Sequence, residues 1–348
     1  MPLSRTRVEN MSLAQSVLSG ERLALARLLT HVENDTPDGR AALDELFAHT
    51  GQAHLIGVTG APGTGKSSLV NQLALHLRKQ QKRIAIVAVD PSSPFTGGAV
   101  LGDRVRMRDL SGDPDVFIRS MATRGSLGGL AQATAGVVQV FDAAGFDIVL
   151  IETVGAGQSE VDIARLAHTT LVVEAPGLGD DIQAIKAGIL EIADILVINK
   201  ADRPGADSTE RALKSMLDLA HPVQKVFMHH GAPLASPHFG VENGGTEGGS
   251  GGGLWIPPIR STVATEGAGL PELLASIQEH AEYLRKSGDW ARSERARLSA
   301  EFDLLVQQLL MARFRSGVPE TRLDQMLDRI QSREISPREA VGQLMEKQ

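Results

Sequence analysis

The segment from residue 60 to residue 67 constrains the fold of this chain more than any other, because it reads Gly-Ala-Pro-Gly-Thr-Gly-Lys-Ser. That spacing, G-x-x-x-x-G-K-[ST], is typical of a phosphate-binding P-loop. It stands between an apolar, strand-like run at 55–59 and a helical pattern that starts at Leu69. Its glycines let backbone N–H groups turn towards phosphates at the amino end of a helix. We expect nine residues to bind a nucleotide: Gly60, Ala61, Pro62, Gly63, Thr64, Gly65, Lys66, Ser67 and Ser68.

Two side chains of the P-loop are expected to carry chemistry. Lys66 should reach the β- and γ-phosphates, and Ser67 should ligate Mg²⁺. The alternative is a glycine-rich turn before a helix that binds no ligand, which the flanking strand and helix disfavour. The loop alone does not separate ATP from GTP, or a kinase from a switch.

Short apolar runs alternate with helical patterns from residue 54 to about residue 200, which predicts an α/β fold. The runs at 84–89 and 195–198 are apolar without alternation, as in strands buried on both faces of a parallel sheet. We therefore expect a P-loop NTPase fold, a mostly parallel sheet flanked by helices. The strands are expected at 54–59, 84–89, 116–119, 147–151, 169–174 and 194–198. A helix near 207–220 and a strand around 223–228 should follow.

The composition narrows the class of protein. The net charge of −7 disfavours nucleic acid as the main partner, because a phosphate backbone requires a basic face. The absence of cysteine excludes disulfides and thiolate zinc sites and suits a reducing cytoplasm. No apolar run approaches the roughly 18 residues of a membrane span, and no secretory signal is visible. Two early arginines would suit a transit peptide, but Glu9 and Glu21 disfavour it. We expect a cytoplasmic protein.

Asn199-Lys200-Ala201-Asp202 follows the apolar run 195–198 and fits the pattern N-K-x-D. The Asp202 carboxylate can accept two hydrogen bonds from guanine, from the ring N–H and the exocyclic amine, whereas adenine offers no such pair of donors. A site built around that pairing discriminates strongly, because a carboxylate left unpaired is costly. Since ligands bind at the carboxyl edge of an open parallel sheet, the pattern favours GTP over ATP. The alternative is a turn with solvated charges.

Three acidic residues are candidates for holding magnesium and its waters. Asp90 closes the run 84–89, Asp103 lies in a glycine-rich segment, and Glu152 follows the run 147–151. Carboxylates at strand ends suit Mg²⁺ or an attacking water. The Gly155 amide would meet the γ-phosphate, as in a switch that orders around it. Asp103 could instead cap a helix, and Gln158 is displaced from the usual position of a water-positioning glutamine.

Three regions follow from these patterns. Residues 1–50 are expected to form an N-terminal helical extension, and residues 51–275 a GTPase domain. That domain includes a flexible glycine-rich loop at 231–253, since seven of the ten residues 244–253 are glycine. Residues 276–348 are expected to form a helical arm, whose apolar stripe could pack on its own domain or on a second copy, with a homodimer slightly favoured. The stripe consists of Leu298, Phe302, Leu305 and Leu309.

Three histidines near the glycine-rich loop, at positions 229, 230 and 238, could in principle capture nickel or zinc. No cysteine or matched carboxylate cluster accompanies them. We therefore favour solvated loop histidines.

With these residues assembled, the chain resembles the methylmalonyl-CoA mutase-associated GTPases, also described as arginine/ornithine transport ATPases or kinases. The resemblance covers nearly the whole chain. Its most specific parts are the runs 89–98 and 152–160. It implies that Asp90, Asp103 and Glu152 serve magnesium and the switches. It also implies a third switch at 179–186, in which Lys186 couples nucleotide state to a partner, and a loop over the guanine base formed by Val263, Ala264 and Thr265.

The resemblance further implies a homodimeric, slow, Mg²⁺-dependent GTPase that acts as chaperone to an adenosylcobalamin-dependent acyl-CoA mutase. Such a protein gates loading and release of the cofactor, protects the mutase from inactivation and does not itself hold cobalamin. The glycine-rich segment 231–253 departs from the family by its length. Three alternatives remain: a phosphotransferase of amino-acid transport, a nickel-insertion GTPase, and a regulatory switch with no enzyme client.

Overall fold

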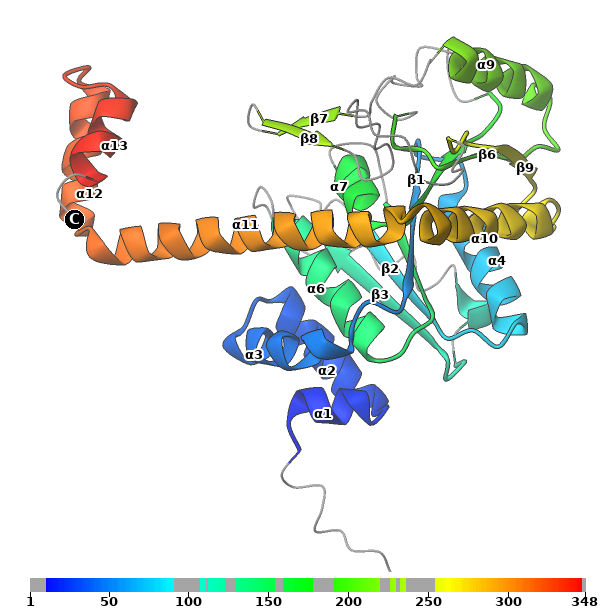
Figure 1. Cartoon of the computed structure of the whole chain (residues 1–348), viewed down its shortest axis with the longest axis horizontal. Helices are drawn as coiled ribbons and strands as arrows, with labels where there is room; N and C mark the ends of the chain where they lie inside the picture. Colours follow the sequence, from blue (N-terminus) through cyan, green and yellow to red (C-terminus); the bar gives the residue numbers. More distant parts are fainter. Residues whose placement is uncertain are drawn as a thin grey trace, which may run out of the picture. The chain divides into compact units, whose positions relative to one another are not determined.

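The fold is described from a computed structural model, which covers residues 11–90, 107–110, 112–122, 129–153, 159–177, 191–219, 226–229, 232–235 and 254–345. The chain divides into two compact units, Met1–Glu294 and Arg295–Gln348. The first unit contains the sheet and all of the residues that form the candidate site (Figure 1).

A seven-stranded sheet with the order β3-β2-β4-β1-β5-β6-β9 forms the centre of the first unit, and all of its neighbouring strands are parallel. The strands are β1 (His54–Thr59), β2 (Ile84–Asp90), β3 (Val116–Ala122), β4 (Ile148–Thr153), β5 (Thr169–Glu174), β6 (Ile195–Asn199) and β9 (Ile259–Thr262). The six strands expected between residues 54 and 200 are confirmed, as is the parallel P-loop NTPase fold. Their apolar runs form strands because both faces of the sheet are covered.

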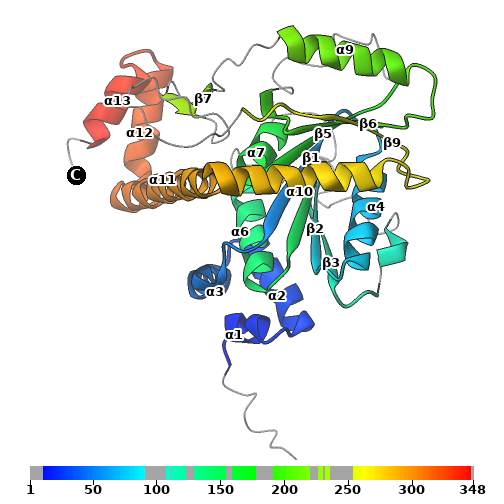
Figure 2. The same ribbon diagram turned by 45° about the vertical axis from the view of Figure 1, so that its right-hand side comes forward.

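Helices cover both faces of the sheet (Figures 1 and 2). On one face α4 (Lys66–Lys79) and α10 (Leu270–Ser287) pack through Leu69, Leu73 and Leu273 against even-numbered residues of β1, β2 and β4. On the other face lie α6 (Gly129–Ala143) and α7 (Ser159–Leu166), and α9 (Ala206–Leu219) packs beside β6 through Leu213. The alternation of strand side chains thus divides the core into two layers.

The N-terminal extension packs on the same face as α6 and consists of α1 (Leu13–Leu18), α2 (Arg22–Glu33), α3 (Pro37–Leu46) and the 3₁₀ turn η2 (Phe47–His49). The helical character expected for this region is confirmed. The stretch 35–39, where a break was expected, already contains the first residues of α3. The Thr36 side chain caps this helix by accepting a hydrogen bond from the Gly39 amide, and Pro37 takes the first helical position, which suits its fixed φ.

The edge of the sheet where the strands begin carries a buried polar network. His54 Nε2 lies 2.8 Å from Thr169 Oγ1, which lies 3.0 Å from His280 Nδ1 on α10. His168 accepts a hydrogen bond from the Leu55 amide through Nδ1, and its Nε2 lies 2.7 Å from a carboxylate oxygen of Glu294. These contacts join the first strand residues to the C-terminal helices of the same unit.

Aromatic rings close this network. The ring of Trp290 stacks on His168 with a centroid distance of 3.9 Å, and the Arg285 guanidinium lies 4.4 Å from the Trp290 ring centroid. Trp255 donates from Nε1 to the backbone carbonyl of Asp194 at 2.9 Å. The amino-terminal edge of the sheet is therefore held by side-chain hydrogen bonds and stacked rings.

The C-terminal helices are α11 (Asp289–Gly317), α12 (Glu320–Gln331) and α13 (Pro337–Met345). The boundary between the two compact units falls within α11, after Glu294. In the second unit the stripe expected on this helix is exposed, most strongly at Phe302 (66%) and Leu309 (70%). The arm is helical, as expected.

Two strands lie where none was expected. β9 joins the main sheet beside β6, and β8 (Ala232–Ala235) pairs antiparallel with β7 (Val226–His229) inside the segment 231–253, which was expected to be a loop. β7 corresponds to the strand expected around 223–228. The glycine-rich residues 236–253 lie outside the described part of the chain. Within the described part, no helix combines the length and hydrophobicity that a membrane crossing would need.

Candidate functional site

The P-loop lies at the carboxyl edge of the sheet, between the end of β1 at Thr59 and the start of α4 at Lys66. β1 stands in the middle of the sheet, between β4 and β5. The ends of β4 and β6 carry Glu152 and Asn199, so the parallel topology brings the three sequence motifs to one edge.

Two glycines of this loop have backbone positions that no other residue fits. Gly60 has φ +135°, and an added Cβ would lie 2.1 Å from the carbonyl oxygen of Val173 on β5. Gly65 has φ +93°, and an added Cβ would lie 2.4 Å from Nδ2 of Asn199. The loop is therefore a tight turn that leaves its own backbone groups to line the site.

Lys66 is buried within the loop that it follows. Its Nζ donates to the carbonyl oxygens of Gly60 at 2.7 Å and Ala61 at 3.0 Å. The Thr64 hydroxyl also donates to the Ala61 carbonyl, at 3.0 Å. A cation held at the mouth of the loop is well placed to bind phosphate oxygens. Of the other residues expected to bind the nucleotide, Pro62, Gly63 and Ser68 are exposed.

Ser67 and Glu152, which were both expected to hold magnesium, are in contact with each other in the structure. The Ser67 hydroxyl donates to Oε1 of Glu152 at 2.5 Å, and the Glu152 carboxylate is almost completely buried at the end of β4. A hydroxyl and a carboxylate are the oxygen ligands that Mg²⁺ prefers, so this pair fits the ion. Asp90 closes β2 on the same edge, and only its backbone is described. Asp103, Gly155 and Lys186 lie outside the described residues.

Asn199 joins the P-loop to the loop after β9. Its Nδ2 donates to the carbonyl of Thr64 at 2.8 Å, and its Oδ1 accepts from the amide of Ala264 at 3.1 Å. The Thr262 hydroxyl donates to the same Oδ1 at 3.3 Å. All of these groups are buried. One amide side chain therefore fixes the distance between the phosphate loop and residues 263–265, which were expected to cover the guanine base.

Lys200 and Asp202 flank this amide. Lys200 adopts φ +59°, and its Nζ donates to the carbonyl of Gly63 at 2.6 Å, so its stem bridges to the P-loop. Asp202 is exposed beyond the end of β6, where its carboxylate is free of the packed core. Val263 donates to the carbonyl of Ala268 and so closes the loop that contains Ala264 and Thr265. Of the residues expected to bind guanine, Asn199 and Lys200 therefore contact the P-loop, and Ala264 contacts Asn199.

Sequence reasoning missed the contribution of Thr262. It sits at the end of β9, and β9 itself was missed because Ile-Arg-Ser-Thr is short and not uniformly apolar. The sequence did contain a signal for this strand. The run 259–262 directly follows two prolines, Pro257 and Pro258, and directly precedes Val263.

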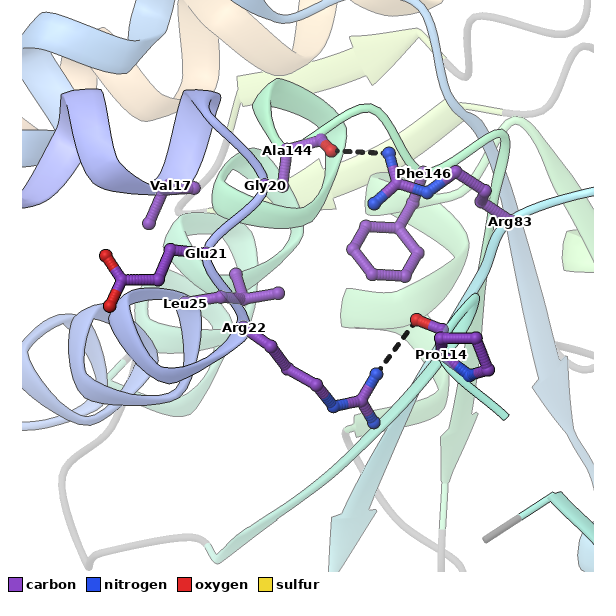
Figure 3. A pocket seen from close by; sticks show the side chains of 9 residues that line it. All are labelled: Val17, Gly20, Glu21, Arg22, Leu25, Arg83, Pro114, Ala144 and Phe146. Carbon is purple, nitrogen blue, oxygen red and sulfur yellow. Dashed lines mark hydrogen bonds between the residues drawn. The ribbon is translucent and has the colours of Figure 1, made fainter. Parts of the chain in front are cut away.

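A small hollow lies away from the P-loop, between the N-terminal extension and the beginnings of the strands (Figure 3). Arg22 donates to the carbonyl of Pro114 at 3.0 Å and Arg83 to that of Ala144 at 2.9 Å, as the dashed lines show. The hollow measures about 30 Å³, which is room for only a few water molecules. Both guanidinium groups are thus used to hold the extension and the strand ends, and we assign the hollow no ligand.

The histidines 230 and 238 lie outside the described residues, and only the backbone of His229 is described, in β7. Within the described ranges no cluster of three or more histidine, aspartate or glutamate side chains could hold a metal ion.

Comparisons with known proteins identify relatives that are named as GTPases. A family model described as methylmalonyl Co-A mutase-associated GTPase MeaB matches residues 25–318. A Pyrococcus abyssi protein named as a GTPase is 42% identical over 333 residues, which is 96% of this chain and 95% of that protein. The GTPase ArgK of Escherichia coli is 33% identical over 334 residues, 93% of this chain and 98% of its own length.

A crystal structure of a LAO/AO transport system kinase has the same fold, with a TM-score of 0.66 at 24% identity over 96% of this chain and 95% of its own. The family model spans most of the chain, and the two sequence relatives exceed 30% identity over nearly all of it. The chain therefore belongs to the family of methylmalonyl Co-A mutase-associated GTPases, MeaB, and is a P-loop GTPase.

Proposed function

We propose that this GTPase uses Mg²⁺ to hydrolyse GTP and acts as the chaperone of an adenosylcobalamin-dependent acyl-CoA mutase. In this role it gates loading and release of the mutase cofactor and protects the mutase from inactivation. The family to which the chain belongs is named for its association with methylmalonyl-CoA mutase, and this is the observation that carries the proposal. The geometry of the site supports the part of the proposal that concerns nucleotide binding.

The residues of the site divide the work of binding and hydrolysis. Lys66 neutralises charge on the β- and γ-phosphates, and the backbone of residues 60–65 holds their oxygens. Ser67 and Glu152 hold Mg²⁺, which when bound neutralises charge on the phosphate oxygens. Asp202 selects guanine, while Asn199 holds the base loop and the P-loop in register. Hydrolysis rests on positioning and electrostatic stabilisation of the transferred phosphoryl group. The intrinsic turnover is low if no well-placed glutamine or arginine completes the site.

Four further residues complete the proposed switches. Asp90 and Asp103 serve the magnesium site and its waters, the Gly155 amide meets the γ-phosphate, and Lys186 couples nucleotide state to the partner. Asp90 closes β2 at the carboxyl edge of the sheet. These roles rest on the resemblance and on chain position.

The chain is further proposed to act as a homodimer in the cytoplasm through a C-terminal arm at 276–348. The exposure of Phe302 and Leu309 supports this, because a helix with large apolar side chains in water gains by pairing. The proposed domains remain the extension 1–50, the GTPase domain 51–275 and this arm. Neither nucleic acid nor membrane is proposed as a partner.

A phosphotransferase of amino-acid transport and a metal-insertion GTPase are the rival functions. The guanine-selecting residues around Asn199 disfavour an ATP-dependent transferase. The described residues offer no metal cluster of the delivery type.

The test is GTP turnover by the purified chain, measured alone and with the acyl-CoA mutase encoded nearest to its gene. We expect a stable complex, faster GTP hydrolysis with the mutase, and slower loss of mutase activity during turnover. Nucleotide binding and basal hydrolysis without any complex or acceleration would contradict the chaperone role and leave the GTPase assignment intact.

A further inference from the structure

We infer that the Thr64 hydroxyl makes the backbone N–H of the same residue available to a phosphate oxygen, because the hydroxyl takes the place of that N–H in closing a turn of the P-loop. The Thr64 side chain is completely buried, and the Asn199 side-chain amide donates to the Thr64 carbonyl at 2.8 Å. The inference deepens the proposed function and rests on it, since it concerns nucleotide binding at the same site.

Residues 61–64 form a tight turn within the P-loop. Their sequence, Ala-Pro-Gly-Thr, suits a type II β-turn, in which proline is favoured at the second position and glycine takes the third with φ of about +80°. Gly63 has φ +85°. In such a turn the carbonyl of the first residue, here Ala61, accepts a hydrogen bond from the N–H of the fourth, here Thr64. The Thr64 N–H is thus the donor that the backbone alone would use to close the turn.

The Ala61 carbonyl oxygen receives its closest contacts from two side chains instead. The Thr64 hydroxyl and the Lys66 ammonium each donate to it at 3.0 Å. The backbone nitrogen of Thr64 lies 3.4 Å from the same oxygen, which is longer than the usual N–H···O bond. A carbonyl oxygen has two lone pairs, so the two side-chain donors are enough to satisfy it. The backbone N–H of Thr64 is therefore only weakly engaged in the turn.

The same contacts place this N–H close to the cation that is assigned to the phosphates. The Lys66 ammonium and the Thr64 N–H both face one oxygen, that of Ala61. A P-loop binds phosphate through its backbone N–H groups. An N–H that gives up only a long bond can turn to a phosphate oxygen at little cost. Pro62, in the same turn, has no N–H to contribute.

Removal of the hydroxyl should return the N–H to the turn. Valine has nearly the shape of threonine but cannot donate, so in Thr64→Val the Ala61 carbonyl loses one of its two side-chain donors. The N–H of residue 64 is then the donor at hand to replace it. The turn still closes, whereas the phosphates lose one donor. We therefore expect a loss of nucleotide affinity with little loss of stability.

The experiment measures the affinities of the full-length chain for GTP and GDP by titration of fluorescent analogues, together with its unfolding in urea. For Thr64→Val we expect both affinities to fall about tenfold, the equivalent of one hydrogen bond to a charged group, while the urea midpoint stays close to that of the wild type. Thr64→Ser keeps the hydroxyl and should bind both nucleotides within about twofold of the wild type.

NMR of the full-length chain, with isotope-labelled threonine, follows the N–H itself. In the wild type the Thr64 amide proton should move downfield when GDP is added, as expected of an amide that begins to donate to a phosphate oxygen. In Thr64→Val, labelled at valine, the amide proton of residue 64 should move much less, because it remains bonded within the turn.

Thr50→Val is the matched control. The Thr50 hydroxyl also donates to a carbonyl three residues earlier, that of Phe47 at 2.8 Å, and its backbone nitrogen lies 3.2 Å from the same oxygen. That turn follows η2 and lies outside the P-loop, so Thr50→Val should leave both nucleotide affinities unchanged.

The inference is overturned if folded Thr64→Val binds GTP and GDP as tightly as the wild type does. It is also overturned if the Thr64 amide proton of the wild type does not move downfield with GDP, a result that needs no valine variant to fold. A wild-type chain that binds neither nucleotide would instead refute the proposed function.

Discussion

Position 65 requires glycine for two reasons, a left-handed backbone and the lack of space for a side chain. Its φ of +93° disfavours any residue with a Cβ, and a Cβ would also press on Asn199, 2.4 Å away. Gly51 has nearly the same φ, +91°, but has open space where its Cβ would lie. The chain therefore contains a control for backbone strain alone.

We predict that Gly65→Ala lowers nucleotide affinity by more than about tenfold, because Asn199 must move and with it the link to Ala264. Gly51→Ala should cost only the conformational term, about 1–2 kcal/mol of unfolding free energy, with nucleotide affinity unchanged. Titration of a fluorescent GDP analogue and urea unfolding of both variants test this. Equal nucleotide affinities in the two variants would contradict the role given to Gly65.

Asp202 provides a second test at the scale of one side chain. Because its carboxylate pairs with two guanine donors in the proposed site, Asp202→Ala should weaken GTP binding by about 10- to 100-fold and leave the weak binding of ATP unchanged. Asp207→Ala, at an exposed position in the first turn of α9, is the control and should bind GTP as the wild type does. Competition between GTP and ATP is the measurement. A preserved preference for GTP would remove Asp202 from the guanine site.

Secondary elements differ in how far their sequence alone predicts them. β1, β2 and β6 are runs of apolar residues buried on both faces, so composition and length suffice to identify them. β9 is a strand because its partner β6 supplies the hydrogen bonds, and its four residues Ile259–Thr262 carry too little pattern to reveal this. Tertiary pairing, not local preference, forms it.

The candidate site also contains parts that the sequence predicts and parts that it does not. The P-loop and the N-K-x-D residues were predictable, since each function there needs a fixed residue type at fixed spacing. The bonds that Asn199 makes to Thr64 and Ala264 connect residues 135 and 65 positions apart. No local spacing encodes such a contact. It follows only from the order of strands in the sheet.

The network around His54 makes stability depend on pH. Burial, and then the nearby positive charges of His168, His280 and Arg285, hold the pKa of His54 well below its usual value of 6.5. The carboxylates of Asp194 and Glu294 face the same network. Above about pH 6.5 His54 is neutral in both the folded and the unfolded chain. As the pH falls below that value the unfolded chain takes up the proton first, so the free energy of unfolding decreases.

We therefore predict that the urea midpoint of the wild type falls between pH 7 and pH 5.5, and that His54→Gln makes this fall smaller. His49→Gln, at an exposed position on η2, should leave the pH dependence as in the wild type. Unfolding curves at several pH values with constant ionic strength test the prediction. A His54→Gln variant with the full acid sensitivity of the wild type would show that another group carries the effect.

At the scale of the whole molecule, the division of the chain after Glu294 gives a natural place to test the proposed dimer. We predict that a chain ending at residue 294 is monomeric, binds GTP and hydrolyses it at the basal rate, because the residues of the site lie in the first compact unit. Light scattering on the full and shortened chains is the measurement. A dimer that survives the truncation would refute an interface in residues 295–348.

Full-length variants provide the control for that truncation. Phe302→Glu and Leu309→Glu place a charge on the exposed stripe of α11 without shortening the chain. Both should weaken the dimer while basal hydrolysis is retained. Gln307→Glu, at an exposed position on the opposite face of the same helix, should leave the dimer intact.

The two tryptophans of the chain, Trp255 and Trp290, both lie at the amino-terminal edge of the sheet, one bonded to Asp194 and the other stacked on His168. The nucleotide residues lie at the other end of the same strands, which for the six residues of β5 is roughly 20 Å away. Intrinsic fluorescence therefore reports on the edge that anchors the C-terminal helices and not on the pocket itself. A change in tryptophan emission when GTP replaces GDP would show, without any label, that a conformational change at the nucleotide site extends to the opposite edge of the sheet.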